Sequence, residues 1–292
     1  MYLKNVSNSK IYNLEEEVYE NPITKVWCGR GSFKNSKCFV KILNYGELVD
    51  KNLARELLFQ TQQEVKVLRK VSECSKLVPR VFDAWDDPKN KCYTIVMSLV
   101  PGISLRMWLN SHKKERLQPK DVFVRKCIIT QLCEVMRDIS KRQPAIVHRD
   151  LKPENIHVNF NSKTRRWEVY VVDFGVAALN HIRNVGTVYY QAPEQVGKKN
   201  TRVCISNKTD IFAIGQIFYE MLLGTPPQIG VDYLVESGQN QWKKLPEISN
   251  YLLQISGMDR IINVLESMTC YNLYDRPTYE RIITNLKNIK VG

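Results

Sequence analysis

The fold of this chain is decided by the stretch His148-Arg149-Asp150-Leu151-Lys152-Pro153-Glu154-Asn155, which the triplet Asp173-Phe174-Gly175 follows further along. Phosphoryl transfer requires a carboxylate that orients the attacking hydroxyl, a cation that neutralises the transferred group, and oxygen ligands that hold Mg²⁺ across the phosphates. This set of groups is supplied by Asp150, Lys152, Asn155 and Asp173. The two motifs therefore indicate a site for phosphoryl transfer.

At these motifs the chain resembles the eukaryotic protein kinase family, and the resemblance extends over nearly its whole length. It implies that Asp150 is the catalytic base and that Lys152 stabilises charge on the transferred group. It also implies that Asn155 and Asp173 are metal ligands, so ATP and Mg²⁺ are the expected cofactors.

The same resemblance gives a packing role to the two ring side chains of the motifs. His148 and Phe174 are expected to join Leu68 in an apolar column that links two lobes. These rings are therefore interpreted as core residues of the kinase-like fold.

Hydrophobic patterning predicts a β-rich part followed by a helical part. Val65, Leu68 and Val71 give the segment 52–72 an apolar stripe, which predicts a helix. Further strands are expected over residues 25–30, 37–43 and 93–100, and further helices over residues 128–139 and 210–223. With the resemblance, this order predicts an α+β fold of the bilobal kinase type. A small β-rich N-lobe is expected in residues 1–99 and a larger α-helical C-lobe in residues 100–292, together one kinase domain.

Motifs downstream of Asp173 resemble the parts of a kinase that bind a protein substrate. The segment from Gly186 to Glu194 resembles the end of an activation segment, and Asp210 resembles the start of the central helix of the C-lobe. Arg276 resembles the late arginine that pairs with the carboxylate of Glu194. Related phosphotransferases for small molecules usually lack these parts, so a protein substrate is expected.

The choice of acceptor hydroxyl depends on two residues. Lys152 follows Asp150 by two positions, and Thr187 follows Gly186, which is the serine/threonine arrangement in this family. Thr187 can form hydrogen bonds to both Asp150 and Lys152. The expected substrates are serine or threonine hydroxyls of proteins.

In the N-terminal part, Lys41 resembles the strand lysine that holds the α- and β-phosphates of ATP, and Glu64 resembles its partner on a helix. Glu56 is the alternative partner, although its downstream pattern fits the family less well. The strand-then-helix order favours a functional pair over the solvated surface pair that two such residues usually form.

The glycine-rich phosphate loop of the family is not found at its usual place. If Val26 is the valine that follows the loop, the loop falls on residues 19–24, which contain Pro22 but no glycine. Proline has no N–H group to offer a phosphate. The alternative loop begins at Gly29, but it lies too close to Lys41, so Gly29 and Gly31 are interpreted as hairpin residues.

The expected adenine site departs from the family pattern at Phe39. Side chains alternate along a strand, so Phe39 and Lys41 point to the same face, where the family usually has an alanine against the adenine ring. Met97 resembles the residue that controls the back pocket. The expected hinge, whose backbone would bond adenine, consists of Ser98, Leu99 and Val100.

Regulation is predicted from the segment between Asp173 and Glu194. This segment has no Ser, Thr or Tyr before Thr187. The usual switch pairs a phosphorylated residue of this segment with the arginine before the catalytic aspartate, here Arg149. We therefore expect activity without phosphorylation of the activation segment.

Composition limits the class of protein and its partners. The 292 residues carry a formal net charge of +13 and contain no apolar run long enough to span a membrane, nor an apolar signal core at the start. The basic residues are scattered in small groups without a long basic tail, which disfavours a nucleic-acid partner and leaves a solvated surface or an acidic protein partner. No C-x-x-C pair occurs, so reduced thiols and an intracellular location are expected. The eight cysteines are Cys28, Cys38, Cys74, Cys92, Cys127, Cys133, Cys204 and Cys270.

Two functions from different classes are compatible with these residues. The first is a serine/threonine protein kinase that uses ATP and Mg²⁺. The second is a pseudokinase that serves as a scaffold or allosteric partner, which the absent glycines and Phe39 would favour. Nucleotide binding and phosphoryl transfer distinguish the two.

Overall fold

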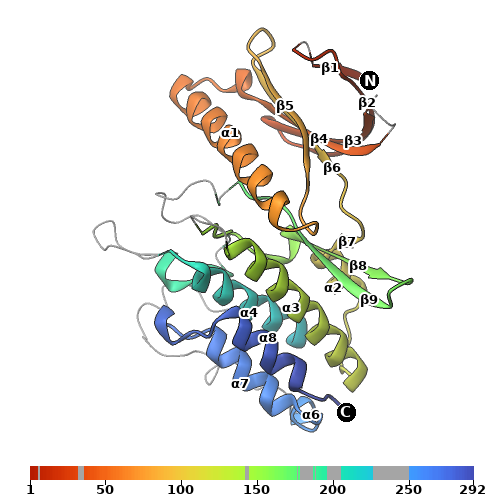
Figure 1. Ribbon diagram of the computed structural model, residues 1–292, viewed down its shortest axis with the longest axis vertical. Helices are drawn as coiled ribbons and strands as arrows, with labels where there is room; N and C mark the ends of the chain where they lie inside the picture. Colours follow the sequence, from red (N-terminus) through yellow and green to blue (C-terminus); the bar gives the residue numbers. More distant parts are fainter. Residues whose placement is uncertain are drawn as a thin grey trace. The chain divides into compact units, whose positions relative to one another are not determined.

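The computed structural model describes residues 1–5, 7–31, 36–141, 145–175, 177, 187, 189–195, 205–225 and 250–292. The chain divides into two compact units, Met1–Val100 and Pro101–Gly292. Figure 1 shows strands and one long helix in the first unit and a mainly helical second unit. The helices and strands expected from the hydrophobic patterning are present, so the α+β class is confirmed.

A six-stranded antiparallel sheet forms most of the N-terminal unit, in the order β1-β2-β3-β4-β6-β5. Side chains alternate between its two faces. Cys38, Val40 and Ile42 of β4 pack in one cluster with Tyr12 and Leu14, which the curled β1–β3 part of the sheet brings over them (Figure 1). The strands are β1 (Tyr2–Lys4), β2 (Ile11–Glu20), β3 (Thr24–Gly31), β4 (Lys37–Asn44), β5 (Val81–Asp87) and β6 (Cys92–Ser98).

The helix α1 (Lys51–Cys74) covers the opposite face of this sheet. It begins after Asp50, whose carboxylate accepts the backbone N–H groups of Asn52 and Leu53 and so satisfies free donors of the first turn. Val65 packs against Leu43 of β4 and Ile95 of β6. The short 3₁₀ helix η1 (Tyr45–Glu47) lies between β4 and α1.

A buried carboxylate fastens the start of the chain to strand β5. The Oδ2 atom of Asp83 accepts hydrogen bonds of 3.0 Å from Asn5, Asn8 and Tyr12. Burial opposes ionisation of Asp83, but the three hydrogen bonds outweigh it and lower the pKa of this carboxyl below its ordinary value. The first strands are thus attached to the sheet by polar contacts as well as by apolar packing.

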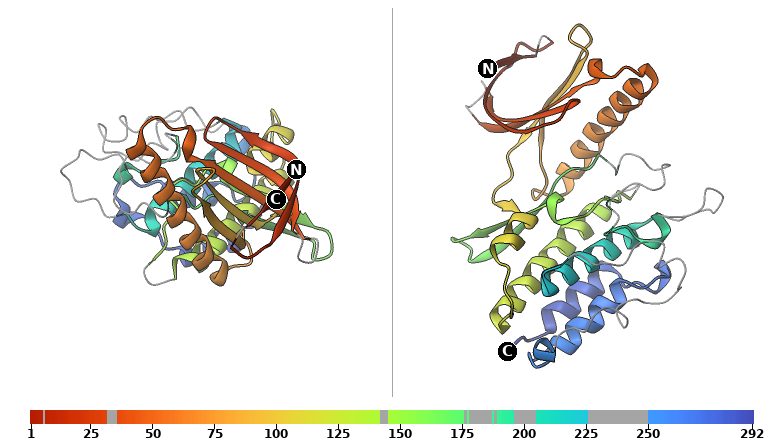
Figure 2. Two further views of the ribbon diagram at one scale, coloured as in Figure 1. Left: turned by 90° about the horizontal axis from the view of Figure 1, so that it is seen from above. Right: turned by 180° about the vertical axis from the view of Figure 1, so that it is seen from behind.

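The C-terminal unit is built around helix α4 (Asn207–Leu223), most of whose side chains are buried. Helix α3 (Pro119–Ser140) contacts α4 and α8 (Tyr279–Asn288), and α7 (Met258–Met268) contacts both α4 and α8. The right-hand view of Figure 2 shows these helices side by side, from α3 in yellow-green through α4 in teal to α7 and α8 in blue.

Shorter elements complete this unit. A small antiparallel sheet consists of β7 (Ile103–Ser104), β8 (Ile156–Asn161) and β9 (Arg166–Val171). The remaining elements of the described ranges are α2 (Leu105–Ser111), α6 (Asn250–Leu253) and the 3₁₀ helices η2 (Pro153–Asn155), η3 (Pro193–Gln195) and η5 (Leu273–Asp275). The stretch from His148 to Asn155 therefore lies directly before β8, and Asp173 lies just after β9.

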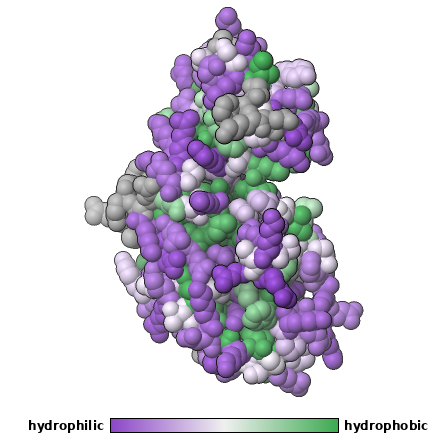
Figure 3. Space-filling view, turned by 45° about the vertical axis from the view of Figure 1, so that its right-hand side comes forward, coloured by the Kyte–Doolittle hydropathy of each residue, from purple (hydrophilic) through white to green (hydrophobic). Residues whose placement is uncertain are grey.

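None of the helices in the described ranges is long and apolar enough to cross a membrane. Figure 3 shows one face of the protein, which hydrophilic side chains largely cover.

Candidate active site

The loop that carries Asp150 is held in place by a buried carboxylate of α4. The two oxygens of Asp210 accept the backbone N–H groups of His148 and Arg149, at 2.8 and 2.9 Å. Burial raises the pKa of Asp210, while His148 and these N–H groups act in the opposite direction. From the sequence, Asp210 was expected only as the start of a helix, and its contacts with the loop were not predicted. The sequence contained a signal for these contacts. A carboxylate at the start of a nearly apolar helix is expected to be buried, and a buried carboxylate needs hydrogen-bond donors.

Gln195 also supports this loop. Gln195 donates its side-chain N–H to the carbonyl of Arg149 at 2.7 Å, and its amide oxygen accepts the backbone N–H of Ala192 at 2.9 Å. Arg149 itself has a φ of 71°, in the left-handed region that non-glycine residues rarely adopt. Such a conformation persists where the surroundings hold it, and it is frequent at functional sites.

The carboxylate of Asp150 is contacted by Thr187, Lys152 and Asn155. Thr187 donates its backbone N–H and its hydroxyl to Oδ1, at 2.8 and 3.0 Å. Lys152 lies 2.9 Å from Oδ2 and also donates to the Thr187 hydroxyl at 3.1 Å. The two hydrogen bonds expected of Thr187 are therefore present. The carboxylate is oriented, and a cation lies directly beside it.

Asn155 and Asp173 are far apart in the chain but lie at the same end of the paired strands β8 and β9. The backbone N–H of Val172 bonds the carbonyl of Asn155 at 3.0 Å, which places residue 173 next to Asn155. The Asn155 amide nitrogen donates to the Asp150 carbonyl at 2.9 Å and to its carboxylate at 3.3 Å, so its amide oxygen keeps the capacity to bind a cation. Asp173 is exposed and has a φ of 62°.

These two oxygen donors suit Mg²⁺, which is held in phosphate sites by one or two protein ligands together with substrate phosphates and water. Within the described ranges no group of three or more His, Cys, Asp or Glu residues could hold a metal by itself.

The rings of His148 and Phe174 pack against each other, with centroids 4.8 Å apart. Both residues are buried, and His148 Nε2 lies 3.0 Å from the carbonyl oxygen of Val172. This contact joins the two motifs that decide the fold. Leu68, the expected third member of the column, is buried in its own unit.

In the N-terminal unit, Lys41 forms an ion pair with Glu64 of α1. Lys41 Nζ lies 3.0 and 2.9 Å from the two carboxylate oxygens, and the side chains are 26% and 7% exposed. Glu56, the alternative partner, is exposed and accepts a hydrogen bond from Gln60. Val26 of β3 is the residue opposite Lys41 in the register of β3 and β4.

The glycine-free segment forms the turn between β2 and β3. Asn21 shapes this turn, because its side-chain oxygen accepts the backbone N–H groups of Ile23 and Thr24 at 2.9 and 2.6 Å. Pro22 therefore lies in a turn whose backbone N–H groups already donate to the side chain of Asn21. Neither glycine candidate lies in this turn.

Gly29 and Gly31 lie on the antiparallel hairpin of β3 and β4, in agreement with their interpretation as hairpin residues. Both belong to β3, and only Gly31 lies at the end of the strand, where its N–H bonds the carbonyl of Ser36. Gly29 lies inside the strand, at a position that β2 approaches too closely for a side chain to fit. A Cβ atom at this position would lie 2.3 Å from the carbonyl oxygen of Asn13.

Phe39 and Met97 are opposite each other in the register of β4 and β6. Phe39 is half-buried and, by strand alternation, lies on the face that carries Lys41. In the expected hinge, Ser98 bonds Arg80 through both its backbone N–H and its hydroxyl oxygen, at 2.8 and 2.9 Å. Leu99 is exposed and Val100 is buried.

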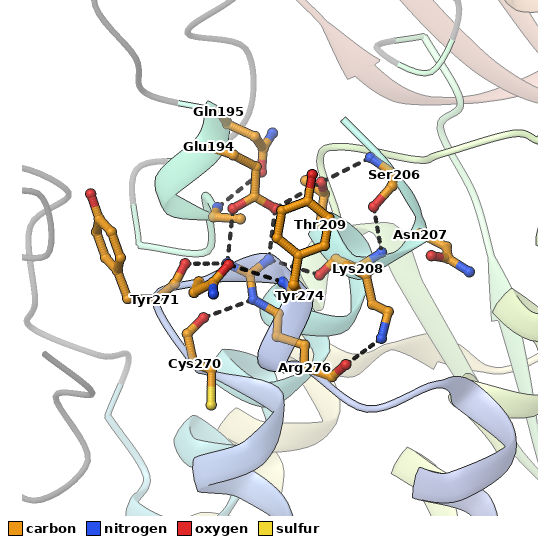
Figure 4. A network of polar contacts seen from close by, with 12 residues as sticks. Glu194, Gln195, Ser206, Asn207, Lys208, Thr209, Cys270, Tyr271, Tyr274 and Arg276 are labelled. Carbon is orange, nitrogen blue, oxygen red and sulfur yellow. Dashed lines mark hydrogen bonds and ion pairs between the residues drawn. The ribbon is translucent and has the colours of Figure 1, made fainter. Parts of the chain in front are cut away.

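A bidentate ion pair joins Glu194 to Arg276 (Figure 4). The guanidinium donates to the two carboxylate oxygens at 2.6 and 2.8 Å, and Arg276 is fully buried. Its remaining N–H groups donate to the carbonyls of Cys270, Lys208 and Tyr271. The pairing expected from the sequence is present, and it fastens the segment after Thr187 to the helical core.

Most of the segment between Gly175 and Thr187 lies outside the described residues. This includes Gly186 and the part on which the prediction about phosphorylation rests. Cys204 also lies outside them, and the other seven cysteines are free.

Comparison with known proteins adds the family. The model of the family described as "Protein kinase domain" matches residues 24–286. The chain is 28% identical over 258 residues to the serine/threonine-protein kinase Nek2 of Homo sapiens, an alignment of 84% of this chain and 52% of that protein. It is 27% identical over 243 residues to the serine/threonine-protein kinase atg1 of Dictyostelium discoideum, covering 80% of this chain and 34% of that protein. The chain thus spans about half or less of the length of these relatives.

Proposed function

Because the chain belongs to the protein kinase domain family and has its bilobal fold, we propose that it transfers the γ-phosphoryl group of ATP to serine or threonine hydroxyls of protein substrates. The observation that carries this proposal is the constellation around Asp150, with Lys152 and Thr187 at its carboxylate and Asn155 beside it. Relatives such as Nek2 are named as serine/threonine-protein kinases, which supports the same reaction.

Asp150 is proposed as the base that orients the attacking hydroxyl and accepts its proton. Its Oδ1 is held by Thr187, so a substrate hydroxyl would approach a carboxylate whose orientation is already fixed. Lys152 lies beside the same carboxylate and would neutralise charge as the phosphoryl group moves. Little covalent chemistry is asked of the protein, since positioning and electrostatics supply most of the rate.

ATP and Mg²⁺ are the cofactors that this family implies. We propose that Asn155 and Asp173 bind the metal and that Lys41, positioned by Glu64, binds the α- and β-phosphates. Val26 and Met97, with the hinge residues Ser98, Leu99 and Val100, are proposed to surround the adenine ring. The metal, once bound, would neutralise the phosphate oxygens.

Serine or threonine is the proposed acceptor because Lys152 and Thr187 bond each other and share Asp150. We also propose an intracellular location. The seven free cysteines of the described residues, several with thiol pKa values raised by burial, are compatible with a reducing compartment.

The test combines nucleotide binding with transfer. Thermal shift with ATP and Mg²⁺ is expected to raise the midpoint of unfolding, and label from γ-labelled ATP is expected to appear on a generic serine or threonine protein. Asp150→Asn, which is nearly isosteric, is expected to lower transfer by at least about 100-fold while the protein remains folded. Asp138→Asn, in the last turn of α3 and with a side chain that is 43% exposed, is the matched control.

The proposal fails if ATP and Mg²⁺ produce neither a shift nor any transfer. That result would support the second function considered from the sequence, a binding protein with a kinase fold. Transfer that survives Asp150→Asn unchanged would remove this residue from the mechanism.

A further inference from the structure

A small basic pocket in the C-terminal unit is not used by the proposed reaction. This basic pocket has a volume of about 80 Å³ and is lined by residues of α2, of the α2–α3 connection and of α3 and α4. Cavities that hold whole small-molecule ligands usually measure several hundred Å³, so this one suits a single functional group. Its cationic side chains are Arg106, Lys113, Lys114 and Arg125.

Arg125 is a buried cation on which the carboxylate of Asp121 acts electrostatically, without an ion pair between the two groups. It is 4% exposed, and its guanidinium donates only to backbone carbonyls, those of Met221, Asp121 and His112, at 2.6, 3.2 and 3.2 Å. It also lies 5.3 Å from the ring of Trp108. Among the residues that the structure describes, no ion pair joins Arg125 to a carboxylate. Burial lowers its pKa, as expected for a cation without full compensation.

The carboxylate that lines the basic pocket is already bound. Glu220 pairs with Arg106 and accepts a 2.6 Å hydrogen bond from the Tyr190 hydroxyl. Arg106 in turn bonds Glu154 at 2.7 Å and Tyr190 at 3.0 Å. Glu220 therefore compensates the charge of Arg106, and the compensation of Arg125 comes from the nearby carboxylate of Asp121, which only partly offsets burial.

The two lysines add positive charge at the edge of the basic pocket. Lys114 lies 2.7 Å from Asp121 in an exposed ion pair, which is weak in water. Lys113 is exposed and makes no ion pair within the described part of the chain. The pocket thus keeps a net positive charge next to a buried guanidinium, and this combination attracts an anion.

Arg106 also connects the basic pocket to the catalytic loop. It bonds Glu154, the residue directly before Asn155, and Tyr190, which follows Thr187 in the segment that ends at Glu194. The basic pocket is therefore linked through the Arg106 side chain to the residue next to Asn155 and to the segment that ends at Glu194.

We propose that the basic pocket binds an acidic side chain of the protein substrate and so favours substrates with an acidic segment near the acceptor hydroxyl. The acidic segment is a substrate only if the proposed kinase function holds, so the proposal rests on that function. Binding of the acidic segment itself can be measured without nucleotide. The overall charge of +13 agrees with an acidic partner.

The test uses three fluorescent peptides of equal length that contain one serine and differ in a flanking run of glutamate, glutamine or lysine. Fluorescence anisotropy without ATP is expected to show the glutamate peptide binding about tenfold tighter than the glutamine peptide, the size of one charge-assisted contact. Lys113→Glu should abolish this preference. Lys163→Glu, an exposed lysine of the β8–β9 turn with the same change in net charge, should preserve it.

Equal binding of the glutamate and glutamine peptides by the unaltered protein would overturn the proposal. Equal loss in the Lys113→Glu and Lys163→Glu proteins would overturn it as well, because the preference would then come from the general surface charge. A second variant, Lys114→Gln, should weaken the preference in part, and circular dichroism shows whether each variant is folded.

The transfer assay separates this proposal from the proposed function. A glutamate preference that depends on Lys113, without any phosphoryl transfer, would contradict the kinase proposal but support binding of an acidic side chain in the basic pocket. Transfer to all three peptides with equal KM would retain the kinase proposal and overturn the pocket.

Discussion

Thr187 gives both its backbone N–H and its hydroxyl to one oxygen of Asp150, at 2.8 and 3.0 Å. The hydroxyl oxygen also accepts a hydrogen bond from Lys152 at 3.1 Å. A neutral side chain thus connects the proposed base with the proposed charge stabiliser. Its removal should disturb the orientation of both.

Thr187→Val tests this connection because valine keeps the branched shape and the backbone N–H but lacks the hydroxyl. We expect kcat for a serine peptide to fall about 10- to 100-fold, the cost of hydrogen bonds to charged groups. Steady-state kinetics with Thr187→Ser as the control, which restores the hydroxyl, should show most of the activity retained. Equal activity of the valine and serine variants would contradict the role.

Phe39→Ala tests whether the phenyl ring limits the space for adenine. Phe39 lies opposite Met97 on the strand face that carries Lys41. If the ring crowds the base, removing it should lower the Kd for ATP with Mg²⁺ by a few-fold, about 1 kcal/mol. Isothermal titration measures the change, and Phe160→Ala, at an exposed position of β8, is the control. An unchanged or higher Kd would show that the ring does not hinder the nucleotide.

Phosphorylation of the segment between Asp173 and Thr187 should not be required for activity, because this stretch has no hydroxyl side chain. Treatment with a protein phosphatase is expected to leave kcat unchanged. Mass spectrometry of the active protein should find no phosphate between these residues. A loss of activity that tracks the removal of phosphate from the segment ending at Glu194 would refute this prediction.

Replacement of Arg276 should destabilise the C-terminal unit strongly. Arg276→Met removes the cation and leaves the carboxylate of Glu194, whose side chain is 7% exposed, without its partner. Breaking a buried pair in this way costs about 3–5 kcal/mol of the free energy of unfolding. Urea denaturation measures it. Arg281→Met, at an exposed position of α8, should change stability by less than about 0.5 kcal/mol, and a similar small effect at Arg276 would contradict the prediction.

Acid should loosen the N-terminal unit through Asp83. Its pKa is lower in the folded protein than its ordinary value near 4. The stabilisation is therefore fully present above about pH 4 and is lost as the pH falls through the folded pKa. Asp83→Asn should lower stability at pH 7 and flatten its dependence on pH below 4. Urea unfolding of both proteins at pH 7 and pH 3 tests the difference, and parallel pH profiles would show that other carboxylates dominate.

The sequence by itself determined the parts that depend on near neighbours. The residues proposed for the reaction in this loop lie close together in the chain, within the stretch from His148 to Asn155. The α1 helix could be predicted from its apolar stripe, which also placed Glu64 on a helix after the Lys41 strand. Such features follow from backbone periodicity and from residue types a few positions apart. The glycine-free turn could be placed for the same reason, by counting back from Lys41.

Only the tertiary structure decided which distant polar groups are buried together. Asp210 reaches the backbone of His148 across 62 positions, and Asp83 gathers Asn5 and Tyr12 across more than 70. Glycine is required at position 29 because β2 approaches β3 closely there, and no local sequence pattern indicates this contact. A buried donor or acceptor takes whatever partner the packing brings to it. The partners of Asp210 and Asp83 and the need for glycine at position 29 are therefore set by the way the helices and strands pack, whereas the proposed catalytic loop can be recognised from its own residues.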